Sequence, residues 1–311
     1  MLAEHFLFIA EVEIHRKACP VVAIRVIASC ITRSTMTNTG KESLAMQYET
    51  ILVDVADHIA TITLNRPEAL NSFTRQMMAE FEHLWKRVAR DDSIHCCVLR
   101  AAPGKAWCTG VDVKESQKPG QAVVDLDNIW HCEDPGIYLG PKSMNCWKPV
   151  VAAVHGMAAG GAFYWLNESD IIICSEDATF FDPHVTYGMT SALEPIGMTY
   201  HMPLHDVLRM VLLGNDERIG AGTALRIGLV SEIVPLGELW PRAHELAAAI
   251  AAKPPAATAG SLKAIWQSLD LPRSVALQQA LKYCQIGNPA GVPQVDRAAL
   301  MADKAKKFTI R

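Results

Sequence analysis

The chain has 311 residues, of which 50% are hydrophobic and 20% are charged, and its formal net charge is −4. These proportions are typical of a globular protein with a sizeable core, and the weakly acidic balance offers no basic surface for a nucleic acid. No apolar run approaches the roughly 18 residues of a membrane-spanning helix, so we expect neither a nucleic acid nor a membrane as a partner.

Residues 1–45 carry no consistent amphipathic pattern. Glu4 stands where a secretory signal would have basic residues, and two further glutamates before residue 14 argue against a mitochondrial presequence. We therefore expect a poorly ordered extension, with Met36 and Met46 as alternative start sites.

From residue 48 the pattern alternates between strands and helices. Apolar runs at 51–53 and 59–64 predict two strands around a turn at Asp57 and His58. Apolar residues at helical spacing over 74–90 predict an amphipathic helix that faces the core. Later apolar runs predict further strands, which lie near residues 97 and 151 and at 170–174.

The second half of the chain is mostly helical. Residues 204–213 predict one helix and residues 221–229 the next, with a break at the two prolines that follow Lys253. Residues 116–146 have no clear periodicity, which is typical of a functional or mobile loop.

A glycine-rich turn ends one predicted strand. Residues 148–161 read K-P-V-V-A-A-V-H-G-M-A-A-G-G, and a helix start follows at 162–166. A strand, a glycine turn and a helix N-terminus in this order present free backbone N–H groups. Such a turn binds an anion, or an oxygen that becomes an anion during a reaction. The spacing lacks the G-x-G-x-x-G fingerprint of a dinucleotide site.

Two other motifs precede this turn. Residues 64–71 read L-N-R-P-E-A-L-N, and residues 104–112 read G-K-A-W-C-T-G-V-D after a strand-like run. In this order and at these separations, the three motifs resemble the crotonase superfamily, also called the enoyl-CoA hydratase/isomerase superfamily. The resemblance covers residues 47–311.

The resemblance implies an α/β fold, with a crotonase-type ββα spiral core and a C-terminal α-helical trimerisation region. We expect three parts: the extension at 1–45, an acyl-CoA-binding core at 46–200 and a helical oligomerisation region at 201–311. It also implies contacts to CoA from five residues, namely Glu68, Ala69, Leu70, Thr109 and Lys114.

The shared chemistry of this superfamily is stabilisation of a thioester enolate by two backbone N–H groups. By position these fall on Val111 and Gly161. Each such donor contributes on the order of 3–4 kcal/mol to the transition state. The alternative is that both segments are only structural turns.

Hydratases of the superfamily add two glutamates that position and activate water. The matching positions here hold Tyr164 and His184, so we predict that both glutamates are missing. Tyrosine, with a reference pKa of about 10, is a poor base at neutral pH, whereas histidine, with about 6.5, is a suitable one. Hydration by the two-glutamate mechanism is therefore not expected.

His184 is a candidate to exchange a proton with the substrate α-carbon, and Tyr164 to donate a hydrogen bond to a substrate oxygen. Glu194 is the nearest downstream carboxylate and a third acid–base candidate. His184 and Tyr164 each have a structural alternative: His184 orders its loop beside Asp182 and Tyr187, and Tyr164 packs between its aromatic neighbours. Glu168 is expected to cap or solvate a helix end. Aromatic residues hint at a bulky or ring-containing acyl group; they are Trp130, Trp147, Phe163 and Trp165.

We therefore predict an enzyme that acts on an acyl-CoA as an isomerase, lyase or hydrolase; the alternative is a non-catalytic acyl-CoA-binding or regulatory protein. CoA enters with the substrate, so no separate cofactor and no metal are expected, and no H-E-x-x-H pair occurs. The predicted partners are the thioester and further copies of the chain, as a trimer or a dimer of trimers. Nine scattered cysteines without C-x-x-C spacing favour reduced thiols and a cytoplasmic location.

Overall fold

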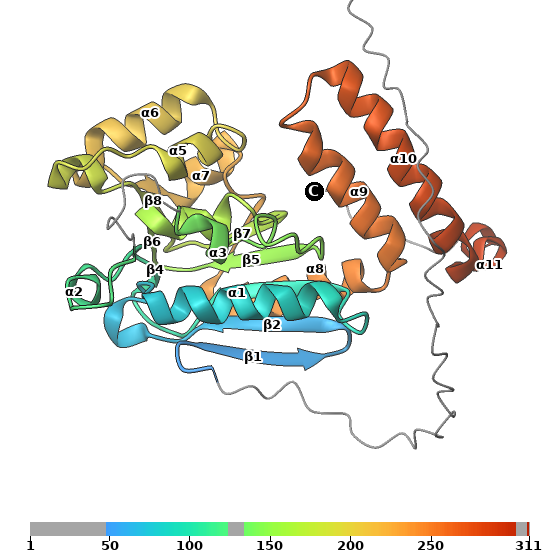
Figure 1. Cartoon of the computed structure of the whole chain (residues 1–311), viewed down its shortest axis with the longest axis horizontal. Helices are drawn as coiled ribbons and strands as arrows, with labels where there is room; N and C mark the ends of the chain where they lie inside the picture. The colour runs from blue at the N-terminus through green and yellow to red at the C-terminus, as the bar shows by residue number, and fades with distance from the viewer. Residues whose placement is uncertain (1–47, 124–133, 303–309, 311) are drawn as a thin grey trace, which may run out of the picture. The chain divides into compact units, whose positions relative to one another are not determined.

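The computed structural model describes residues 48–123, 134–302 and 310 (Figure 1). Contacts divide the chain into residues 1–42 and residues 43–311. The first unit and the predicted extension at 1–45 lie outside the described residues.

The larger sheet has the order β1-β2-β3-β5-β7-β10 within the described residues. Its strands are β1 (Ile51–Ala56), β2 (Ile59–Leu64), β3 (Cys96–Ala101), β5 (Val150–Val154), β7 (Ile171–Ser175) and β10 (Glu232–Val234). β1 and β2 form an antiparallel hairpin, and the pairings beyond β2 are parallel. Asp57 and His58 both have positive φ, of 50° and 66°, as a two-residue type I′ hairpin turn requires.

The smaller sheet has the order β4-β6-β8-β9 within the described residues. Its strands are β4 (Ala106–Cys108), β6 (Met157–Ala159), β8 (Thr179–Phe181) and β9 (Ile219–Gly220). Each of β4, β6 and β8 directly follows a strand of the larger sheet, and these three run parallel as neighbours. Because parallel neighbours end at the same sheet edge, the loops after β4, β6 and β8 come together. This arrangement positions the site.

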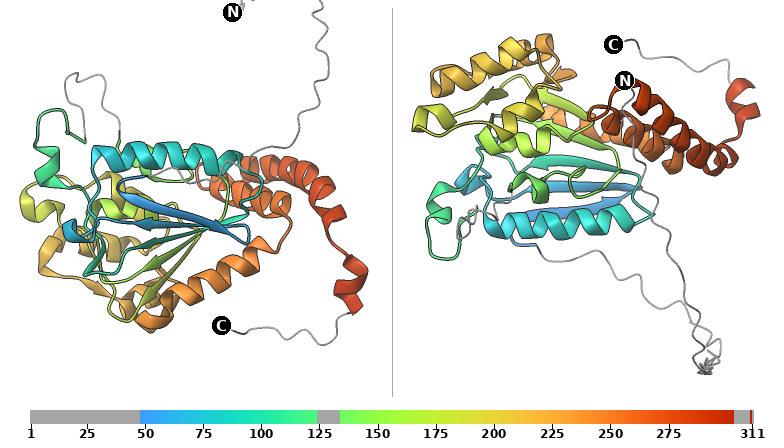
Figure 2. Two further views of the ribbon diagram at one scale, coloured as in Figure 1. Left: turned by 90° about the horizontal axis from the view of Figure 1, so that it is seen from below. Right: turned by 45° about the horizontal axis from the view of Figure 1, so that its top comes forward.

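Two helices cover opposite faces of the larger sheet (Figure 2). α1 (Arg75–Arg90) begins at Thr74, whose side chain accepts a hydrogen bond from the Met77 N–H; such a cap contributes about 1 kcal/mol. α8 (Leu239–Ala251) packs against β3 and β5. Alternate residues of β3 face the two helices: Leu99 packs in the cluster with α1, and Val98 packs in the cluster with α8.

The remaining helices are short in the core and longer toward the end of the chain. They are η1 (Pro67–Ala69), α2 (Val113–Ser116), α3 (Gly136–Leu139), η2 (Gly160–Ala162), α4 (Phe163–Leu166), η3 (His184–Tyr187), α5 (Leu193–Met198), α6 (Leu204–Leu213), η4 (Gly214–Asp216), α7 (Ala221–Ile227), η5 (Leu236–Glu238), α9 (Pro255–Ser268), α10 (Arg273–Gly291), η6 (Val292–Gln294) and α11 (Arg297–Ala302).

The expected α/β class, with a repeated ββα order and C-terminal helices, is confirmed. α9 and α10 pack side by side (Figure 1), and the Trp266 indole N–H donates to Asp170 Oδ1 at 2.6 Å, which ties α9 to the start of β7. β9 and β10 lie beyond residue 201 and complete the two sheets, so the later part of the chain supplies strands as well as helices. Among the described helices, none combines the length and apolar character that a bilayer crossing requires.

Candidate active site

The loop after β4 presents the backbone of Gly110 and Val111. Gly110 has a φ of +84°, a conformation that favours glycine. The loop is held by a parallel bridge in which the Phe73 N–H donates to the Gly110 carbonyl and the Asp112 N–H donates to the Phe73 carbonyl, both at 2.8 Å. This bridge leaves the N–H of Val111 outside the pairing.

The loop after β6 turns through Gly160, whose φ is +50°, into η2 and α4. Gly161 is the second residue of η2, so no preceding helical carbonyl accepts its N–H. The two loops are in backbone contact, because a Cβ placed on Gly110 would lie 3.0 Å from the Gly161 nitrogen. The structure therefore brings the Val111 and Gly161 turns together; their role as oxyanion donors stays a prediction.

The loop after β8 brings His184 to the same place. The Cε1 atom of its ring lies 3.4 Å from where a Cβ on Gly160 would be. Its Nδ1 lies 2.7 Å from Asp182 Oδ1, and its Nε2 lies 3.9 Å from Glu194 Oε1. The hydrogen bond to Asp182 raises the pKa of His184 above its ordinary value, outweighing the effect of burial.

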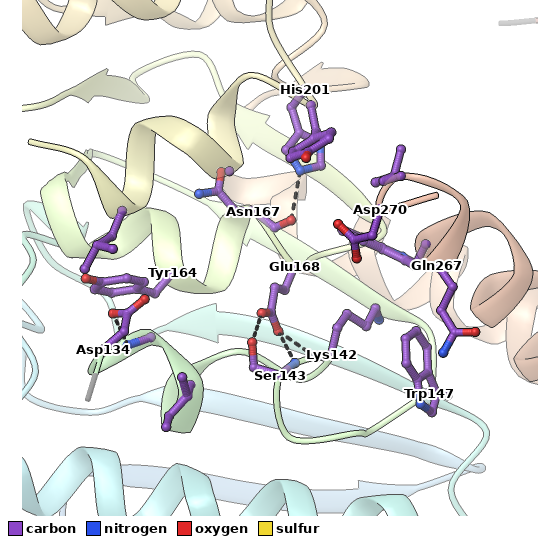
Figure 3. A pocket seen from close by; sticks show the side chains of 17 residues that line it. Asp134, Lys142, Ser143, Trp147, Tyr164, Asn167, Glu168, His201, Gln267 and Asp270 are labelled. Carbon is purple, nitrogen blue, oxygen red and sulfur yellow. Dashed lines mark hydrogen bonds between the residues drawn. The ribbon is translucent and has the colours of Figure 1, made fainter. Parts of the chain in front are cut away.

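Glu194, on α5, lies between His184 and Tyr164. Burial raises the pKa of the Glu194 carboxyl, and the nearby His184 opposes that rise. Burial also raises the pKa of Tyr164, and the charges of Glu194 and Asp134 and hydrogen bonds to them raise it further. Tyr164 therefore keeps its proton near neutral pH, which suits a hydrogen-bond donor better than a base. Figure 3 shows Tyr164 beside Asp134.

The ring of Tyr164 is held by close packing. It meets Phe73 edge-on at a centroid distance of 6.2 Å, and it lies so close to Gly136 that a Cβ there would be 2.4 Å from the ring. Phe73 in turn lies against Gly161, where a Cβ would be 2.6 Å from the Phe73 ring. The three acid–base candidates, Tyr164, His184 and Glu194, thus converge beside the paired turns.

The five residues predicted to contact CoA lie on two neighbouring segments. Glu68 and Lys114 are exposed, and Ala69, Leu70 and Thr109 are partly exposed. The Arg66 guanidinium pairs with Asp112 Oδ2 at 2.9 Å, which joins the segment around η1 to the start of α2. One edge of the molecule therefore carries all five, and their contact to CoA stays a prediction.

Tyr164 is one of the residues that line a cavity of about 470 Å³ (Figure 3). Its walls come from the segment around α3, from α4 and α5, and from α9. Apolar and aromatic side chains share the wall with polar ones, among them Ile137, Trp147, Leu193, Trp266 and Asp134.

The structure corrects the interpretation of the aromatic residues. Phe163 and Trp165 are wholly buried in the core, and neither lines the cavity. Their neighbour Tyr164 faces outward, because successive residues of a helix point in directions about 100° apart. Trp147 does line the cavity, and Trp130 lies outside the described residues.

Glu168 does not cap or solvate its own helix. Its Oε2 accepts the backbone N–H groups of Lys142 at 2.6 Å and Ser143 at 2.9 Å, and its other oxygen accepts the Ser143 hydroxyl (Figure 3). Burial raises the pKa of this carboxyl. Glu168 thus fixes the loop that forms one wall of the cavity.

From the sequence, Asp182 is predicted only as a neighbour beside which His184 orders its loop, and Asp134 is not singled out. Asp182 is fully buried, and the proximity of an acid two residues before His184 was the only available signal. Asp134 lies in the aperiodic stretch before α3, where no local pattern indicates a partner for Tyr164.

A sequence profile of the enoyl-CoA hydratase/isomerase family matches residues 54–289. (E)-Benzylidenesuccinyl-CoA hydratase from Thauera aromatica is 32% identical over 238 residues, covering 76% of this chain and 88% of that protein. 1,2-Epoxyphenylacetyl-CoA isomerase from Escherichia coli is 31% identical over 212 residues, covering 66% of this chain and 78% of that protein.

Solved structures agree with these sequence matches. An enoyl-CoA hydratase/isomerase from Mycobacterium paratuberculosis superposes with a TM-score of 0.72 at 33% identity, covering 85% of this chain and all of that one. With a family profile that spans most of the chain and relatives above 30% identity, the chain belongs to the enoyl-CoA hydratase/isomerase family, within the crotonase superfamily.

Proposed function

We propose that this protein transfers a proton at the α-carbon of an acyl-CoA thioester, through an enolate stabilised by the N–H groups of Val111 and Gly161. The reaction is isomerisation or C–C cleavage through this enolate, in preference to two-glutamate hydration; thioester hydrolysis would instead use the same N–H groups to stabilise the tetrahedral oxyanion formed when water adds to the carbonyl carbon. The observation that carries this proposal is the position of the His184–Glu194 pair, which lies beside Gly160 and hence next to the paired turns.

The pair suits proton transfer near neutral pH. A general base works best when its pKa lies near the working pH. The hydrogen bond to Asp182 raises the pKa of His184 above its ordinary 6.5, and burial raises the pKa of Glu194 above its ordinary 4.5. His184 removes the α-proton, and Glu194 stabilises the imidazolium that results.

The acyl group occupies the cavity beside Tyr164 in this proposal. Trp147, Trp266, Ile137 and Leu193 offer it an apolar wall, and Asp134 with Tyr164 offers a polar one. A volume of about 470 Å³ has room for a ring-bearing acyl group. Two relatives have names that include ring-bearing acyl-CoA compounds, which supports a ring-containing substrate here.

CoA itself lies along the edge formed by η1 and the start of α2. The exposed Lys114 ammonium is suited to a phosphate group. Ala69, Leu70 and Thr109 are partly exposed on the same two segments and would contact the rest of CoA. No separate cofactor takes part.

The test is exchange of the α-proton in heavy water, measured by mass spectrometry over a set of acyl-CoA esters with and without an aromatic ring. We expect deuterium incorporation by the wild type and a loss of at least about 100-fold in His184→Gln, since general base catalysis contributes 10²–10⁴-fold. Tight binding of the esters without exchange would instead favour the non-catalytic acyl-CoA-binding protein.

The proposed assembly is a homotrimer or a dimer of trimers. Large apolar side chains are exposed on α5, α6 and α10, among them Ile196, Leu212 and Ile286 at 62%, 70% and 72% exposure. Exposed apolar surface of this kind marks association. Light scattering coupled to size-exclusion chromatography tests the proposal, and a monomer at micromolar concentration contradicts it.

A further inference from the structure

Asp182 is a fully buried carboxylate at the end of β8 with a complete set of hydrogen bonds. Its Oδ1 accepts from the His184 backbone N–H at 3.0 Å and lies 2.7 Å from His184 Nδ1. Its Oδ2 accepts the Ser191 hydroxyl at 2.7 Å. A buried charge is costly unless it is paired and hydrogen-bonded, and here both oxygens are satisfied.

These bonds fix the imidazole of His184. An ionised carboxylate only accepts hydrogen bonds, so Nδ1 carries the proton. The neutral ring then has its lone pair on Nε2, the atom that faces Glu194 at 3.9 Å. Because the same oxygen also holds the backbone of His184, the ring and its loop are oriented together.

Asp182 also reaches the segment that carries Glu194. Ser191 lies three residues before Glu194, in the stretch that leads into α5. One buried carboxylate therefore holds both partners of the acid–base pair, His184 through its ring and Glu194 through Ser191.

We propose that Asp182 is a positioning residue that sets the tautomer of His184 and aligns the His184–Glu194 pair. This inference rests on the proposed function, since it assigns Asp182 a part in that proton transfer. The charged groups that face His184 are Asp182 from its own loop and Glu194 from α5, and Asp134 acts on Glu194 from the segment before α3.

Histidine Cε1–H exchange measured by mass spectrometry follows the titration of each histidine without any substrate. In the full-length protein, Asp182→Asn removes the negative charge and is expected to lower the His184 midpoint by about one pH unit or more. Ser191→Ala removes a donor and leaves a less neutralised carboxylate, so it is expected to raise that midpoint. If the substitutions merely loosened the loop, the His184 midpoint would fall toward the ordinary histidine value in both variants.

Activity gives a second readout. We expect kcat for α-proton exchange to fall roughly 10²- to 10⁴-fold in Asp182→Asn, with KM within threefold, because the imidazole loses its fixed tautomer. The acid limb of the pH profile should move down with the His184 midpoint. Asp177→Asn is the matched control, since it removes the charge from a similar carboxylate, which accepts the Ser175 hydroxyl on the turn before β8; we expect an unchanged His184 titration and unchanged turnover.

An unchanged His184 midpoint in Asp182→Asn overturns the inference and leaves the proposed function standing. A lowered midpoint with full turnover shows that turnover does not depend on Asp182 and overturns the inference, whereas the proposed function is decided separately by the exchange assay on His184→Gln. If Asp182→Asn does not fold, Ser191→Ala decides: a raised midpoint with kcat reduced roughly threefold to tenfold supports the inference, and a lowered or unchanged midpoint refutes it.

Discussion

Gly110→Ala is the sharpest test of the paired turns. At a φ of +84° an alanine is strained, at a cost of about 1–2 kcal/mol. Its Cβ would also lie 3.0 Å from the Gly161 nitrogen and 3.3 Å from the Ala159 carbonyl oxygen. Both contacts are to backbone, so the turns must separate by a few tenths of an ångström. Overpacking of this kind costs about 1–3 kcal/mol.

The two costs together predict a loss of roughly 2–5 kcal/mol in the free energy of unfolding. Separation of the turns also moves one N–H away from the thioester oxygen. Removal of one oxyanion donor lowers turnover by about 10²–10³-fold. Because Gly110→Ala displaces the donor and does not delete it, we expect its loss of turnover to lie at the lower end of that range.

Gly120→Ala is the matched control. Gly120 has a φ of +73° and open space around it, with no atom within 4 Å of an added Cβ. The Gly120→Ala variant therefore carries the backbone strain of about 1–2 kcal/mol but does not change the separation of the Val111 and Gly161 turns. The assays are α-proton exchange in heavy water and urea unfolding at one temperature. Equal turnover in the two alanine variants would refute the reasoning, because the strain is shared and only the contact to Gly161 differs.

Three other outcomes are expected. Deletion of residues 1–35 leaves the melting temperature and the oligomeric state unchanged, since the family match begins at residue 54 and contacts divide the chain after residue 42; a large fall in melting temperature contradicts this. Crotonyl-CoA hydration, followed by loss of the unsaturated thioester absorbance, is slow or absent in the wild type and in the single variants Tyr164→Glu and His184→Glu, because water must be held between one accepting and one donating group. Rapid hydration by the wild type would show that Glu194 has replaced a glutamate of the hydratases, and only the double variant is expected to gain activity. The difference in the free energy of unfolding between wild type and Asp182→Asn is widest between pH 3.8 and 6.5. The pKa of Asp182 is lowered in the folded protein, so its stabilising contribution is lost as the pH falls through that folded-state pKa. The pKa of His184 is raised in the folded protein, so its stabilising contribution is lost as the pH rises through that folded-state pKa. Urea unfolding across pH 3–9 measures it, and a difference that does not vary with pH contradicts it.

The features that could be predicted from the sequence are those set by local pattern. The turn at Asp57 and His58, the helix that begins after Thr74 and the proline break before α9 all follow from spacing and from residue type. The convergence of Val111, Gly161 and His184 follows once β4, β6 and β8 are known to be parallel neighbours.

The walls of the cavity could not be predicted in this way. Trp266 reaches Asp170 across 96 positions of sequence, and no local pattern encodes such a contact. Phe163, Tyr164 and Trp165 are three consecutive aromatic residues, and only the docking of α4 decides which one faces the cavity and which two are buried. The partners of Glu168 were missed for the same reason, because Lys142 and Ser143 come from a loop 25 and 26 residues away.

The central claim is that the N–H groups of Val111 and Gly161 polarise a thioester carbonyl. Isotope-edited infrared difference spectroscopy of an acyl-CoA with a ¹³C-labelled thioester carbonyl, bound to the protein, measures that polarisation directly. We predict that the carbonyl band moves to lower wavenumber on binding to the wild type and moves less on binding to Gly110→Ala, with Gly120→Ala like the wild type. A bound thioester whose carbonyl band stays at its position in water would contradict the account.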